Sequence, residues 1–136
     1  MQNILIIFPY GNLNKKEKRF IQIKKIIEHI INLAENMLNK NIKLFLLISE
    51  QIEPEKYFNR GQLLNIGLKY FKKNIGNPTS LIFHDIDILP NKLMFKQYLR
   101  ENNSLSLLPN TLLYKKIYDL DSCIFYSLLL LLPLVI

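Results

Sequence analysis

The sequence predicts an α/β fold in which a mostly parallel sheet is flanked by helices. Three short apolar runs of strand length alternate with two longer segments whose apolar residues recur every three or four positions. Apolar runs without polar alternation are typical of strands buried on both faces, and strands that alternate with helices are typical of parallel pairing. With 136 residues, the chain is long enough for one domain with a buried core.

Two strands and a long helix are expected in the first 48 residues. Ile4–Phe8 is predicted as a buried strand that ends before Pro9, and Ile42–Ile48 as a second strand. Between them, Lys15–Asn39 has the period of an amphipathic helix, with Asn14 as its N-cap residue. The apolar stripe of this helix is expected to face the core, and it consists of Phe20, Ile23, Ile26, Ile27, Ile30, Ile31, Ala34, Met37 and Leu38.

The next segments continue the alternation. Asn59–Lys73 is predicted as a helix, Leu81–Phe83 opens a third strand, and Lys92–Arg100 is a candidate short helix. Beyond these, Ser104–Leu108 is a candidate strand and Leu112–Tyr118 is ambiguous. The expected order is therefore β-α-β-α-β, with right-handed crossovers between parallel strands.

The basic charge of the chain does not indicate a nucleic-acid partner. The net charge is +7, but of the 18 basic residues only Arg19, Arg60 and Arg100 are arginines. Arginine is the side chain that binds bases and phosphates through paired hydrogen bonds. The many Lys, Asn and Ile residues fit A/T-rich codons, so we expect no nucleic-acid binding.

The two ends of the chain bear on its location. Cys123 is the only cysteine, which excludes an internal disulfide and a cysteine-cluster metal site. The apolar N-terminus lacks the basic region and cleavage site of a signal peptide, so a cytoplasmic chain is expected. Residues 119–136 form a leucine-rich tail. If the apolar part of this tail, from Cys123 onward, formed a helix, the helix would be about 21 Å long. The hydrocarbon core of a bilayer is about 30 Å thick, so this helix would be too short to span it, and only weak membrane association is expected.

Two carboxylates follow the third predicted strand. Because side chains alternate along a strand, Asp85 and Asp87 are expected on one side and Ile86 and Ile88 on the other. Ligands of open α/β sheets bind at the carboxyl ends of the strands. Neighbouring carboxylates repel unless a cation lies between them, and hard divalent ions prefer carboxylate and phosphate oxygens. The pattern favours a divalent ion that bridges the protein to a diphosphate; the alternative is a solvated turn in which the aspartates cap backbone amides.

A second candidate feature is the helix start Phe58-Asn59-Arg60-Gly61. A helix N-terminus with a nearby guanidinium suits an anionic phosphate, and Phe58 is placed to stack on a base. The alternative is that Phe58 packs in the core and that Arg60 is merely exposed.

Together these features resemble the β-1,4-galactosyltransferase family, glycosyltransferase family 7. Members have an F-N-R-[GA]-x-L-L-N-x-G helix start and then an apolar strand that ends in D-x-D-x-x-P, and Phe58–Pro90 contains both in order. Upstream, Pro9-Tyr10 is similar to the start of the family's P-[YF]-R segment, and Glu50-Gln51 to the pair that ends its second strand. The resemblance extends over residues 4–90.

The resemblance implies a GT-A, Rossmann-like domain, with residues 1–118 as its nucleotide-sugar-binding part. It implies transfer of galactose or a related sugar from a UDP-sugar to a carbohydrate acceptor, with inversion and with Mn²⁺ as cofactor. By position, Pro9 and Tyr10 would border the uridine, and Phe58 and Arg60 would contact the nucleotide.

The same resemblance assigns the metal. Asp87 would be the metal ligand, and Asp85 would assist it and help to place the sugar nucleotide. Of the two histidines, His29 is expected on the helix surface and His84 in a packing role.

The sequence also departs from the family pattern. Gly11 stands where the family has arginine, and the chain has no Trp, whereas the family's catalytic base lies in a Trp- and Gly-rich segment. No base is assigned, since the only acidic residues after Pro90 are Glu101, Asp119 and Asp121. We therefore expect a donor-binding N-terminal part, truncated after the D-x-D strand, with a frameshifted or non-native tail. The alternative function is a non-catalytic remnant or UDP-binding module.

Overall fold

The structure is a computed structural model of the whole chain, and it describes residues 1–11, 16–52, 57–100 and 129–134. The predicted α/β order is confirmed. In chain order the elements are β1 (Gln2–Gly11), α1 (Lys16–Met37), β2 (Ile42–Gln51), α2 (Arg60–Asn74), β3 (Ser80–Phe83), α3 (Lys92–Tyr98) and β4 (Leu129–Leu134). The expected N-cap Asn14, the candidate elements between residues 104 and 118, and Cys123 lie outside the described residues.

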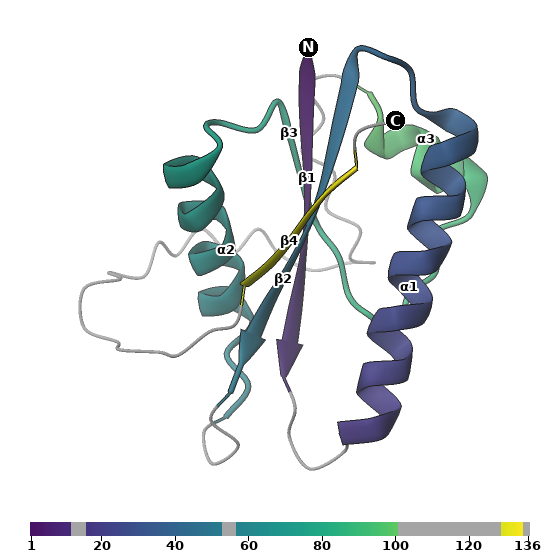
Figure 1. Cartoon of the computed structure of the whole chain (residues 1–136). Coiled ribbons are helices and arrows are strands. Elements are labelled where there is room, and N and C mark those ends of the chain that lie inside the picture. Colours follow the sequence, from purple (N-terminus) through teal and green to yellow (C-terminus); the bar gives the residue numbers. More distant parts are fainter. Residues whose placement is uncertain (12–15, 53–56, 101–128, 135–136) are drawn as a thin grey trace.

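The four strands form one sheet in the order β3-β1-β2-β4. The central strand β1 pairs in parallel with both β2 and β3, as the sequence predicts. Strand β4 comes from the leucine-rich tail and pairs antiparallel with β2, which the sequence analysis did not predict. Figure 1 shows β1 and β2 pointing the same way, so that their carboxyl ends lie at one edge of the sheet.

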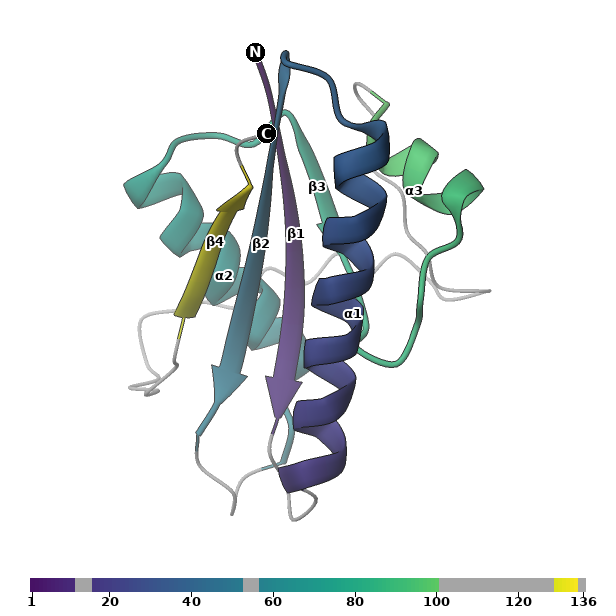
Figure 2. The same ribbon diagram turned by 45° about the vertical axis from the view of Figure 1, so that its right-hand side comes forward.

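Helices cover both faces of this sheet. Alternate residues of β1, beginning with Ile4 and Ile6, pack under α1 and α3, whereas Leu5 and Ile7 pack under α2. Figures 1 and 2 show the same arrangement, with α1 and α3 on one side and α2 on the other. Because both faces are covered, every residue of the central strand from Ile4 to Tyr10 is buried, which explains its continuous apolar run.

Both central strands extend beyond their expected ends. Strand β1 continues through Pro9, and β2 continues into the polar residues that end at Gln51. Pro9 has no backbone N–H, and the direction of the neighbouring backbone groups shows why none is needed. The carbonyl of Ile7 faces β3, where it accepts a hydrogen bond from His84 N at 3.0 Å. The backbone nitrogen of Pro9 faces the same side, beyond the last paired residue of β3, so its missing N–H costs no bond of the sheet.

One residue of the expected α1 stripe is misplaced. Ile23, Ile26, Ile30 and Ala34 are buried, but Phe20 is 63% exposed. Successive residues of an α-helix are rotated by about 100° around its axis, which places Phe20 at the edge of the apolar stripe. Phe20 also lies in the first turns of the helix, near its free end. Among the described residues, no helix combines the length and the apolar character that crossing a bilayer requires.

Candidate functional site

Functional groups from three strands and a helix start meet at the carboxyl edge of the sheet. Strand β1 ends there with Tyr10, β2 with Glu50 and Gln51, and the D-x-D segment follows β3. Tyr10 and Glu50 are register partners in neighbouring parallel strands. This edge is where open α/β sheets place their ligands.

Gln51 fixes the start of α2 against the end of β2. Its buried side-chain amide donates to the carbonyl of Tyr57 at 3.3 Å and accepts from the backbone N–H of Asn59 at 3.0 Å. Asn59 is the N-cap of α2, and its side-chain oxygen accepts from Gln62 N at 3.1 Å. Gln51 therefore binds the backbone on both sides of Phe58, at Tyr57 and at Asn59, and so fixes the position of Phe58.

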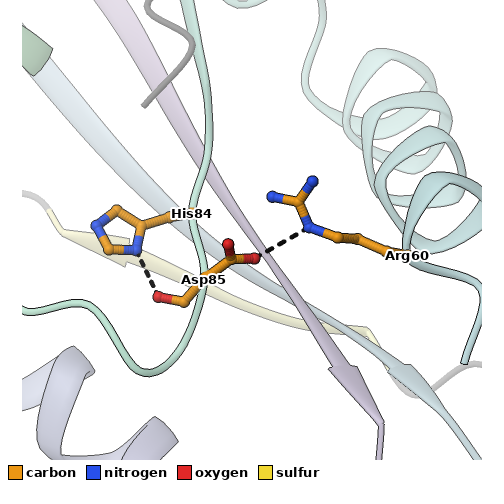
Figure 3. A network of polar contacts seen from close by, with 3 residues as sticks. All are labelled: Arg60, His84 and Asp85. Carbon is orange, nitrogen blue, oxygen red and sulfur yellow. Dashed lines mark hydrogen bonds and ion pairs between the residues drawn. The ribbon is translucent and has the colours of Figure 1, made fainter. Parts of the chain in front are cut away.

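An ion pair joins the two sequence motifs. Arg60, the first residue of α2, donates from Nε to Oδ1 of Asp85 at 3.0 Å, and each side chain is about a third exposed (33% and 31%). Figure 3 shows the terminal nitrogens of Arg60 directed away from Asp85. A pair this exposed stabilises a fold by about 0–1 kcal/mol. Its main consequence is to orient both groups, so the interpretation of Arg60 as merely exposed is wrong.

The strand context expected for the aspartates is also wrong. Strand β3 ends at Phe83, and Ile86 and Asp87 lie in a turn, so strand alternation does not apply to them. In this turn Ile86 packs against the core cluster that lies under α1 and α3, while Asp87 stays exposed. Asp85 and Asp87 differ accordingly, since one is half-buried and ion-paired and the other is open to solvent.

His84 has the packing role that the sequence indicates. Its ring is 2% exposed and contacts Phe8 and Tyr98, at centroid distances of 5.5 Å and 5.8 Å. Burial lowers the pKa of the imidazole, which favours the neutral form. The neutral ring donates from Nδ1 to the carbonyl of Asp85 at 2.8 Å (Figure 3). His84 thus fixes the backbone from which the Asp85 side chain extends.

His29 is not the simple surface residue that the sequence indicated. It is half-buried on α1, and its Nε2 lies 2.7 Å from the carbonyl of Pro90. Because a carbonyl only accepts, Nε2 is the donor. The bond fastens the last residue of the D-x-D-x-x-P segment to the helix. Helical periodicity alone could not reveal this contact, since it spans 61 positions.

The remaining expected nucleotide residues lie at the same edge. Pro9 and Tyr10 are buried in β1, and burial together with the nearby Glu50 carboxylate raises the pKa of the Tyr10 hydroxyl. Phe58 is half-buried rather than part of either core cluster. Its ring lies against the end of β1 and below the guanidinium of Arg19, a residue that no sequence motif singled out.

The two D-x-D carboxylates are the candidate metal ligands at this edge. Within the described part of the chain, no cluster of three or more His, Cys, Asp or Glu side chains is suited to a metal ion. Mg²⁺ and ions like it commonly bind one or two protein carboxylates and take further oxygens from substrate phosphates and water. Asp87 and Asp85 therefore fit an ion that is held jointly with a phosphate ligand.

The fold and this edge define an α/β protein with charged groups suited to an anionic ligand. Residues 1–97 match the family described as the N-terminal region of glycosyl transferase group 7. The chain belongs to that family, as its motifs indicated. No curated protein and no solved structure matched the chain.

Proposed function

We propose that the carboxyl edge of the sheet binds a UDP-sugar and that the chain transfers its sugar to a carbohydrate acceptor. The sugar is galactose or a related hexose, and the transfer inverts the anomeric centre. Membership in glycosyl transferase group 7 supports a sugar donor and an acceptor in general. The donor, the sugar and the stereochemistry are the specific parts of the proposal.

The Arg60–Asp85 ion pair is the main support. It brings the helix start of one motif to the carboxylates of the other, although the two residues are 25 positions apart. The two terminal nitrogens of Arg60 point away from Asp85 (Figure 3), and the N-terminus of α2 adds a partial positive charge. A diphosphate is the ligand that this combination suits best.

The other residues take roles that follow from their positions. Pro9 and Tyr10 border the uridine from the end of β1, and the half-buried ring of Phe58 contacts the nucleotide. Asp85 orients Arg60 and helps to place the sugar. Mn²⁺, held by Asp87 with Asp85, would neutralise charge on the departing diphosphate.

Turnover and binding are measured separately to test this function. The purified chain is incubated with UDP-galactose or UDP-N-acetylgalactosamine, with and without Mn²⁺, and UDP release is followed while calorimetry records UDP binding. Manganese-dependent binding with turnover is the expected result. Binding without turnover would instead favour the UDP-binding module, and no binding of UDP in the presence of Mn²⁺ would contradict the proposal.

A further inference from the structure

Arg19 lies at the carboxyl edge although it comes from the opposite helix layer. It is half-buried near the start of α1, and its Nη1 donates to the carbonyl of Gly11 at 2.5 Å. Its guanidinium carbon is 5.9 Å from the centroid of the Phe58 ring, within cation–π range. Arg19 thereby links the last residue of β1 to the segment that precedes α2.

Gly11 makes room for this arrangement. A Cβ at this position would lie 2.4 Å from Cδ2 of Phe58, closer than atoms can approach. The ring therefore occupies the space of the missing side chain, and Arg19 contacts both the ring and the glycine carbonyl. Three chain segments fix the position of one guanidinium.

Arg19 has no ion-pair partner among the side chains that the structure describes. A guanidinium has five N–H donors, and the carbonyl of Gly11 takes one of them. No carboxylate in the described ranges forms an ion pair with Arg19, in contrast to Arg60 and its partner Asp85. Arg19 is thus a positioned cation with spare donors. Its guanidinium lies over the ring of Phe58, the residue two positions before Arg60 in the chain.

We propose that Arg19 binds the diphosphate of the nucleotide donor, as a specificity-determining residue beside Arg60. This inference rests on the proposed function, because it concerns the same site. Guanidinium groups bind phosphate oxygens through paired, charge-assisted hydrogen bonds. Arg19 favours nucleoside diphosphates over the uncharged nucleoside, whereas Phe58 contacts the nucleotide irrespective of its charge.

The test compares the affinities for UDP and for uridine, each titrated by calorimetry in the presence of Mn²⁺. Arg19→Gln keeps a donor for the Gly11 carbonyl but removes the charge, and Arg19→Lys keeps a charge without the planar fork. Arg100→Ala is the matched control, because Arg100 is exposed and its carbonyl accepts from Ser80 at the other edge of the sheet. Thermal melts confirm that each variant is folded.

We expect Arg19→Gln to weaken UDP binding roughly tenfold, the usual effect of losing a charge-assisted bond. Its affinity for uridine should change less than about twofold, and Arg19→Lys should lie between Arg19→Gln and the unchanged protein. Arg100→Ala should bind both ligands normally. Unchanged UDP binding by Arg19→Gln would overturn the inference, and so would an equal loss for UDP and uridine, since Arg19 would then only support Phe58.

The same experiment separates this inference from the function on which it rests. If the unchanged protein does not bind UDP, the proposed function fails and the inference fails with it. If the unchanged protein binds UDP and Arg19→Gln binds it equally well, only the role of Arg19 is overturned.

Discussion

The two edges of the parallel sheet use polar residues in opposite ways. At the amino edge, the amide of Gln2 lies 3.5 Å from the Ser80 hydroxyl, which donates to the carbonyl of Arg100 at 3.3 Å. The hydroxyl of Thr79 accepts from the backbone of Asn3 at 3.1 Å. These interacting groups are neutral. At the carboxyl edge the polar side chains include the charged groups Arg19, Arg60 and Asp85, and Asp87 is exposed.

The difference indicates which edge is built for a ligand. An open hollow of about 590 Å³ lies at the amino edge, lined by Met1, Gln2, Asn39, Asn41, Ile42 and Leu99. None of these side chains is charged, in contrast to Arg19 and Arg60 at the carboxyl edge. Charge and hydrogen-bonding capacity favour the carboxyl edge as the place for an anionic ligand.

The largest expected effect comes from Arg60→Ala. We expect at least a tenfold loss of UDP affinity, since a charge-assisted contact is removed, with a change of less than about 1 kcal/mol in the free energy of unfolding. Calorimetry and urea denaturation measure the two quantities. The control is Arg100→Ala, which should change neither. Equal UDP affinity in Arg60→Ala and the unchanged protein would remove the distinction between the edges.

Gly11→Ala should lower the stability of the fold. The added Cβ would lie 2.4 Å from the Phe58 ring, so the ring must move, and overpacking of this kind costs about 1–3 kcal/mol. The matched control is Gly61→Ala, where the nearest atom to a Cβ lies at 3.9 Å. Within a helix, that alanine should stabilise by up to about 1 kcal/mol. Similar denaturation midpoints for both variants would show that Phe58 does not depend on Gly11.

Ser80→Ala tests the amino edge. Ser80 is buried, and its hydroxyl bonds with Gln2 and the carbonyl of Arg100, so its loss should cost about 1 kcal/mol of stability. Because our account places the ligand at the opposite edge, UDP affinity should be the same as in the unchanged protein. A weaker UDP affinity of Ser80→Ala in calorimetry would indicate that UDP binds at the amino edge, which would contradict our account.

The smallest effect concerns Glu50 and depends on pH. Burial raises the pKa of the Glu50 carboxyl, so the folded state binds this proton more tightly than the unfolded state does. The stabilising contribution is then complete below the unfolded pKa and is lost as pH rises through the folded pKa. Glu50→Gln should therefore raise the melting temperature at pH 7 more than at pH 4. An increase of equal size at both pH values would contradict this assignment.

Much of the fold follows from periodicity in the sequence. The apolar runs predict β1, β2 and β3 because strands covered on both faces need no polar residues, and Asn59 marks the start of α2 as its N-cap. Strand β4 was not predicted, since a run of leucines does not distinguish a strand from a helix. The extension of β1 through Pro9 depends on which side of the strand has a partner, which only the assembled sheet shows.

The site was predictable only in part, because some of its contacts depend on how distant segments come together in the fold. The motifs singled out Arg60 and Asp85, and the structure joins them directly. Arg19 and His29 act through backbone carbonyls, of Gly11 and of Pro90, and such contacts leave no pattern of residue types in the sequence. At Gly11 the expected arginine is missing, and the structure places Arg19 against this residue.

The most direct test of the carboxyl edge as the ligand site is an NMR experiment with UDP and Mn²⁺. Manganese is paramagnetic and broadens the signals of nearby nuclei, and Mg²⁺ serves as the diamagnetic control. Our account predicts that the amide signals of Tyr10, Arg60 and Asp85 broaden while those of Gln2 and Ser80 stay sharp. Broadening centred on Gln2 and Ser80, or no effect of Mn²⁺ and UDP on any of these signals, would contradict it.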